Sequence, residues 1–186
     1  MLAYLFWHWP RPQVEVARYE AGMLAFHRSL AADAPSGFRR SLTVRVGPAP
    51  WLQGETQGYE DWYVVADSAA LDPLNAAAVS GGRRGPHDGV AYAAAGGSGG
   101  LYRWQWGALD LAEAGSATWL GKPDGVSYAD FGARLRGWVG ERPVALWQRQ
   151  MVLGPAREFC LLSCEELSLP EGVEAIVVAR EGIGEA

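Results

Sequence analysis

The sequence contains very few cysteines. Cys160 and Cys164 are the two that occur in 186 residues, and two thiols provide neither a disulfide framework nor the four ligands of a structural zinc site. Four residues of a strand span about 13 Å, which is too far for these side chains to form a disulfide with each other. We therefore expect free thiols in a reducing compartment, which makes the expected location cytoplasmic, and we predict no metal site.

Long apolar runs and an excess of positive charge are also missing. No apolar stretch approaches the roughly 18 residues that a membrane span requires. The net charge is −5, whereas nucleic acids and anionic membranes attract basic surfaces, so neither is expected as a partner. The first ten residues have no positively charged start and no small-residue cleavage site, and we interpret them as a strand rather than a signal peptide.

Motifs of known chemistry are absent as well. The run Gly96–Gly100 is not followed by the Gly-Lys-Ser/Thr of a P-loop, and it lacks the spacing of a dinucleotide-binding fingerprint. No Gly-x-Ser-x-Gly nucleophile elbow occurs. We expect residues 96–100 to form a flexible hinge, we predict no cofactor, and we interpret Glu60 and Asp61 as solvated loop charges.

The sequence does contain segments in which apolar residues follow a helical period, and these alternate with segments that follow the two-residue period of a strand. Apolar residues between positions 14 and 32 recur at steps of three and four, which is typical of one helix face. Residues 38–46 alternate between apolar and polar, which is typical of a strand. The other elements expected in the first half are strands over 4–9, 61–66 and 89–95 and a short helix over 72–79.

The second half repeats this order. A strand is expected to begin at Ala117, and Ser127-Tyr-Ala-Asp130 matches the capping signal that opens a helix. The strands expected after this helix cover residues 144–153, 158–163 and 175–179. Each half thus consists of strand, helix, strand, strand, connection and strand.

One stretch of the two halves also matches in residues. Val46-Gly47-Pro48-Ala49 corresponds to Leu153-Gly154-Pro155-Ala156, a separation of 107 positions (154 − 47). The same separation aligns the polar face of strand 38–46 with polar residues of the second half, since Ser41 and Thr43 correspond to Gln148 and Gln150. The sequence therefore predicts an α+β fold of two ferredoxin-like βαββαβ repeats with antiparallel sheets, over residues 1–106 and 107–186.

This order and repeat resemble the dimeric α/β-barrel superfamily, whose members use ferredoxin-like units. The resemblance implies that the two sheets pair face to face into a barrel, with helices outside and a pocket within. It also implies a range of functions, because the superfamily includes small cofactor-independent monooxygenases, haem-degrading enzymes, cyclases and isomerases. A tandem chain can close the barrel from its own halves, and a homodimer is the other arrangement expected.

The polar face of strand 38–46 supplies the first candidate site. If the apolar face packs on the helices, the residues that line the barrel cavity and bind the ligand are Arg39, Ser41, Thr43, Arg45, Gln148 and Gln150. Such a cavity would suit a small ligand with an anionic or carbonyl oxygen, because arginine donates two parallel hydrogen bonds to it. The alternative is that these strands face solvent.

His8 is the candidate catalytic residue. It shares a strand face with Tyr4, a further candidate ligand-binding residue, and it can act as a general base, as an axial haem ligand, or simply as a buried histidine that holds a backbone carbonyl. We interpret His27 as a residue of the helix core. His87 and Asp88 are expected to point to opposite faces of a strand and so not to form a pair.

The function predicted from these features is binding of a small hydrophobic or aromatic molecule. The nine tryptophans either fill the core or line such a cavity. The alternatives are a cofactor-independent monooxygenase or isomerase that acts on an aromatic or polyketide-like substrate, and a haem-binding protein. The sequence leaves open whether the chain is an enzyme.

Overall fold

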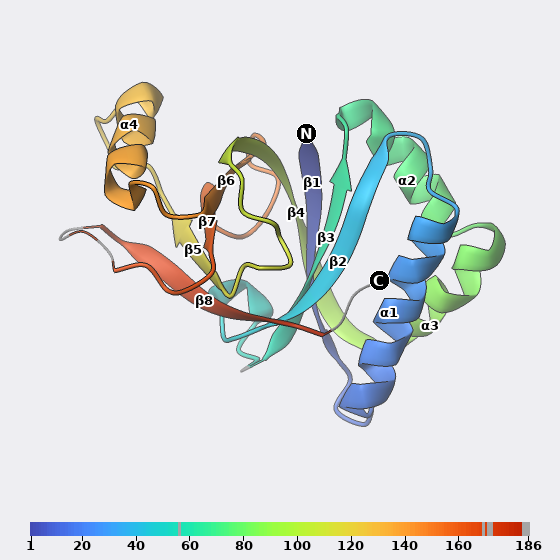
Figure 1. The fold of residues 1–186 in the computed structure, drawn as a ribbon. Coiled ribbons are helices and arrows are strands. Elements are labelled where there is room, and N and C mark those ends of the chain that lie inside the picture. Colours follow the sequence, from blue (N-terminus) through green and yellow to red (C-terminus); the bar gives the residue numbers. More distant parts are fainter. Residues whose placement is uncertain (56, 169, 171–172, 184–186) are drawn as a thin grey trace.

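A computed structural model describes residues 1–55, 57–168, 170 and 173–183. Eight antiparallel strands form one closed barrel in the order β1-β3-β2-β8-β5-β7-β6-β4 (Figure 1). The strands are β1 (Leu2–Pro10), β2 (Phe38–Val46), β3 (Gly58–Val65), β4 (Ala94–Gly107), β5 (Ser116–Leu120), β6 (Val144–Arg149), β7 (Phe159–Ser163) and β8 (Ala175–Gly182). The α-helices are α1 (Val16–Ala32), α2 (Leu71–Ala78), α3 (Arg84–Ala93) and α4 (Tyr128–Val139).

Both halves of the barrel have the same strand order. The first half runs β4-β1-β3-β2 and the second β8-β5-β7-β6, which is the fourth, first, third and second strand of each repeat. The edges join where β2 pairs with β8 and β4 pairs with β6. The predicted α+β fold of two paired ferredoxin-like repeats is therefore confirmed. The boundary between residues 106 and 107 stays a prediction, because the two halves share one barrel.

The barrel interior is filled by aromatic side chains. Residues alternate along each strand, so Leu5 and Trp7 of β1 point inward, where Trp7 packs edge to face against Trp119 at 5.6 Å between ring centroids. Trp62 and Trp147 make a similar contact at 5.2 Å. These tryptophans are buried core residues, so aromatic rings pack much of the barrel interior.

The helices are distributed unevenly over the outside of the barrel. Helices α1, α2 and α3 cover the sheet of the first repeat, and α4 lies against the second (Figure 1). The Oγ of Ser127 accepts a hydrogen bond from the Asp130 amide at 3.1 Å, which confirms the helix start expected there. In the second repeat, the described residues between β7 and β8 contain no helix.

Two expectations for the first repeat were wrong. Residues 89–93 do not form a strand, because they belong to α3, where the partly buried Val90 and Ala93, three positions apart, pack against α1 and β3. Strand β4 begins only at Ala94. Residues 96–100 are not a hinge but the paired middle of β4, with Phe6 opposite Gly99. A side chain at Gly97 would lie 2.5 Å from the Phe6 ring, so the glycines serve close packing of β4 on the rings of β1.

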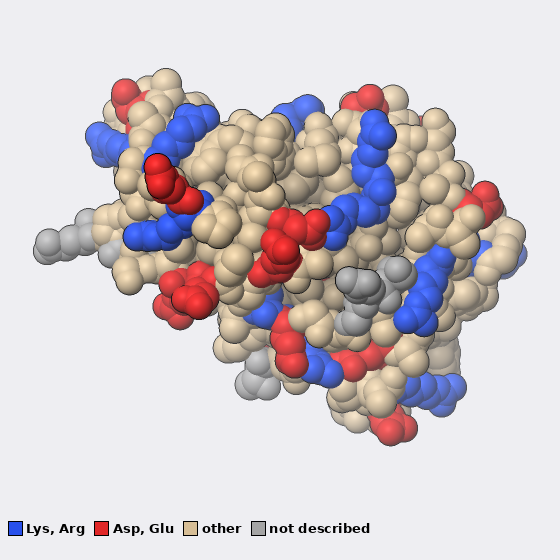
Figure 2. Space-filling model, viewed as in Figure 1, with Lys and Arg blue, Asp and Glu red and all other residues tan. Residues whose placement is uncertain are grey.

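Charges of both signs mix on the surface. On the face in Figure 2, Lys and Arg side chains lie among Asp and Glu side chains rather than in one basic field. Among the described residues, no helix combines the length and apolar character needed to cross a bilayer.

Candidate ligand-binding cavity

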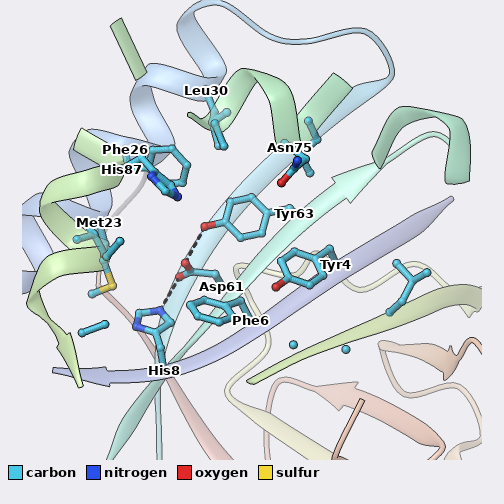
Figure 3. A pocket seen from close by; sticks show the side chains of 18 of the residues that line it. Tyr4, Phe6, His8, Met23, Phe26, Leu30, Asp61, Tyr63, Asn75 and His87 are labelled. Carbon is cyan, nitrogen blue, oxygen red and sulfur yellow. Dashed lines mark hydrogen bonds and ion pairs between the residues drawn. The ribbon is translucent and has the colours of Figure 1, made fainter. Parts of the chain in front are cut away.

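The main cavity lies outside the barrel, between the first sheet and its helices. It has a volume of about 830 Å³ and a mostly apolar lining. Its floor comes from the outward residues of β1 and β3, and its roof from α1, α2 and α3 (Figure 3). The roof residues Met23, Phe26 and Leu30 recur at steps of three and four on α1, so one helix face closes the cavity.

The outward residues of β1 and β3 bring the polar groups together. Tyr4, Phe6 and His8 alternate with inward residues on β1, and Asp61 and Tyr63 do so on the neighbouring β3. The aromatic rings form a stacked floor, with Phe6 and His8 at 5.1 Å between centroids. The cavity is therefore mostly apolar, with a polar corner around Asp61 and two further polar side chains, Asn75 and His87, in its lining (Figure 3).

Asp61 is the centre of that corner. Its Oδ2 accepts a hydrogen bond of 2.8 Å from the Tyr63 hydroxyl, and its Oδ1 lies 3.4 Å from the Nε2 of His8 and 3.4 Å from the Nε2 of His27. The Nδ1 of His8 is hydrogen-bonded to the Tyr19 hydroxyl at 2.6 Å. Figure 3 shows Asp61 between His8 and Tyr63. The five side chains come from α1, β1 and β3.

Three polar atoms of the corner lack a hydrogen bond, although Asp61 Oδ1 lies within ion-pair distance of both imidazoles. His8 Nε2, His27 Nε2 and Asp61 Oδ1 are buried and have no hydrogen bond of good geometry among the described residues. Buried polar atoms without partners are costly and rare. Because His8 and Asp61 line the cavity, a ligand with one polar hydrogen can supply the missing interaction at this point.

The electrostatics keep the carboxyl charged. Burial is the largest single influence on the pKa of Asp61 and by itself would raise it. The adjacent His8 and His27 together outweigh burial and hold the pKa of Asp61 well below its ordinary value. Burial, and then the charge of Asp61, raises the pKa of the Tyr19 and Tyr63 hydroxyls. At neutral pH the corner therefore contains one carboxylate and protonated phenols.

The predicted site residues separate into two groups. His8 and Tyr4 line the cavity. The prediction that the polar face of β2 points into the barrel was wrong, because Leu42 and Val44 point inward and Ser41, Thr43 and Arg45 lie under α1.

The reason for this inversion is that both faces of β2 are covered. Helix α1 presents polar partners to the strand, so the Oγ of Ser41 is hydrogen-bonded to His27 at 2.7 Å and Arg45 donates to Glu20 at 2.6 Å. Alternation alone does not tell which face turns inward when both have partners.

The remaining predicted residues also lie away from the cavity lining. Arg39 is exposed at the end of β2. Gln148 donates to Glu158 at 3.0 Å, and Gln150 accepts from Arg103 at 2.9 Å. None of these residues is among the described residues that line the main cavity, so their role in ligand binding stays a prediction.

Sequence reasoning missed Asp61, which is 3% exposed rather than a solvated loop charge. The signal was its place in the alternating run Asp61-Trp62-Tyr63-Val64, which makes it an internal strand residue.

The expectation for His87 and Asp88 was also wrong: on helix α3 their side chains meet, with His87 Nδ1 at 3.0 Å from Asp88 Oδ1. In the described residues, no group of three or more His, Cys, Asp or Glu side chains is arranged to hold a metal ion.

The fold and cavity define a class of protein: an α+β barrel of two ferredoxin-like repeats with an apolar cavity beneath the helices of the first. No family model and no curated protein matches the sequence. The structure is similar to the crystal structure of a protein from Lactobacillus acidophilus NCFM with the description "putative monooxygenase". The TM-score is 0.54 and the identity 10%, over 96% of this chain and 93% of that one. This likeness shows the fold alone, a closed antiparallel α+β barrel.

Proposed function

We propose that the chain binds a small aromatic or enolic molecule with an acidic hydroxyl in the cavity, and that His8 accepts the proton of that hydroxyl. The observation that carries the proposal is a pair of buried atoms, His8 Nε2 and Asp61 Oδ1, which lie 3.4 Å apart without a hydrogen bond at the polar corner of a mostly apolar cavity. The apolar walls select the ring, and the corner selects the hydroxyl.

His8 is suited to accept a proton at Nε2. When Nδ1 is protonated and donates to the Tyr19 hydroxyl, Nε2 carries the lone pair and lies beside the cavity. The imidazolium formed by proton transfer lies 3.4 Å from the Asp61 carboxylate, which stabilises the positive charge. Tyr63 holds that carboxylate in place through its other oxygen.

Loss of this proton is the first step of two activities. An ionised phenol or enol is electron-rich, and it can react with oxygen without a cofactor or take up a proton at carbon as in an isomerase. Of the two activities, oxygenation is favoured by the likeness in fold to the protein described as a "putative monooxygenase".

The test uses a pair of probes that differ in one proton. 4-Nitroanisole and 4-nitrophenol have the same ring, but only the phenol can ionise, and its anion has a distinct absorbance. We expect both to bind, and the ratio of phenolate to phenol to rise at least about tenfold in the cavity, a shift of one pKa unit. His8→Gln should abolish the rise and keep 4-nitroanisole binding.

His87→Gln is the matched control, because His87 also lines the cavity but pairs with Asp88 on α3. This variant should ionise 4-nitrophenol as the wild type does. Binding of 4-nitroanisole without ionisation of 4-nitrophenol in the wild type would contradict the catalytic part of the proposal. Failure of both probes to bind would contradict the whole.

Gly99→Ala is expected to weaken binding of 4-nitroanisole about fivefold, equivalent to about 1 kcal/mol. A methyl group at Gly99 would lie 2.7 Å from the Tyr4 ring, which must then move into the cavity. Gly82→Ala is the control, since nothing lies within 4 Å of its added carbon. Equal affinities of the two variants, measured by titration, would argue against a ligand at Tyr4.

A further inference from the structure

We propose that the proton taken up by His8 leaves the site through Asp61, His27 and Ser41 and reaches solvent beside β2. The proposal rests on the proposed function, because it concerns the fate of the same proton. It assigns His27 and Ser41 to an exit path that is separate from the ligand entrance.

The path is a continuous series of polar contacts. The carboxylate Oδ1 of Asp61 lies 3.4 Å from the Nε2 of His8 on one side and 3.4 Å from the Nε2 of His27 on the other. The Nδ1 of His27 is hydrogen-bonded to the Ser41 hydroxyl at 2.7 Å. His27 is fully buried, whereas Ser41 is partly exposed, so the series runs from the cavity floor to the surface.

His27 is held in the orientation that this path needs. Its ring stacks on Tyr63 at 5.2 Å between centroids and an angle of 16°, and Tyr63 is itself fastened to Asp61. His27 is not among the cavity-lining residues, so it cannot contact a ligand there. A buried imidazole with one nitrogen toward a carboxylate and the other toward a partly exposed hydroxyl is suited to move a proton.

A bound ligand makes such a path useful. The cavity is open to solvent when empty, but a ring that lies over His8 blocks the direct route from this side chain to solvent. The proton on His8 Nε2 passes to Asp61 Oδ1, which releases it to His27 Nε2. The proton on His27 Nδ1 then passes to Ser41, whose hydroxyl proton goes to water, so no charge is gained or lost along the series.

The experiment follows two signals after rapid mixing with 4-nitrophenol in weak buffer. Phenolate absorbance reports the proton leaving the ligand, and bromothymol blue reports its arrival in solvent. In the wild type the two signals should rise together. In Ser41→Ala, and in His27→Gln, phenolate should still form while release to solvent lags at least tenfold, and Ser41→Thr, which keeps the hydroxyl, should restore the wild-type rate.

Structural damage is measured separately, because 4-nitroanisole should bind all of these variants with wild-type affinity. Release from Ser41→Ala and His27→Gln at the wild-type rate would overturn the exit path and direct the proton through the cavity entrance. If the wild type binds 4-nitroanisole but never ionises 4-nitrophenol, the proposed function itself fails, and the exit path fails with it.

Discussion

Replacing Glu60 by glutamine is expected to lower the free energy of unfolding by about 3–5 kcal/mol, the usual cost of removing one partner of a buried ion pair. Glu60 is 1% exposed inside the barrel, where it accepts hydrogen bonds of 2.7 Å from the indoles of Trp7 and Trp62. It also lies 3.2 Å from the guanidinium of the buried Arg180. The variant would leave that cation without its counter-charge.

Urea denaturation followed by tryptophan fluorescence measures this effect directly. Glu113→Gln is the control, because Glu113 is exposed and its loss of charge should change stability by less than about 0.5 kcal/mol. If Glu60→Gln lowers the free energy of unfolding by less than about 1 kcal/mol, the expectation is contradicted. The backbone carbonyls of Leu111 and Ala114, which also accept hydrogen bonds from Arg180, would then be sufficient to stabilise the buried cation.

Asp61→Asn is expected to cost about 3 kcal/mol at pH 7, because it removes the carboxylate that faces two buried imidazoles. The effect should depend on pH in a defined direction. The pKa of Asp61 is lowered in the folded protein, so its contribution is complete above the unfolded value of about 4 and is lost as the pH falls through the folded value. The stability difference between wild type and variant should therefore persist from pH 7 to about 4 and shrink below.

Asp88→Asn is the matched control for this series. Asp88 also faces a histidine, and the hydrogen bond from His87 lowers its pKa, but Asp88 is exposed and His87 is partly exposed. Exposed pairs contribute little, so this variant should have nearly the stability of the wild type at any pH. A difference for Asp61→Asn that grows as the pH falls below about 4 would contradict an ionised Asp61 in the folded protein.

The sequence by itself determined the architecture. The alternation of residues 38–46, the helical stripe through Tyr19, Met23 and Phe26, and the match between Gly47 and Gly154 predicted two ferredoxin-like repeats, and the barrel has them. These signals are local or periodic along the chain, so they can be recognised without knowing which residues are neighbours in the folded structure. His8 and Tyr4 followed from the same argument, because residues two and four positions apart on a strand share one face.

Only the tertiary structure decided where the cavity lies and which residues join His8. Both faces of β2 are covered, by the barrel core on one side and by α1 on the other, so polarity did not reveal which face turns inward. The polar corner combines β1, α1 and β3, and Asp61 meets His27 across 34 positions (61 − 27) of sequence. A contact between residues so far apart in sequence depends on strand register and on helix packing. The spacing of residues along the chain gives no information about either.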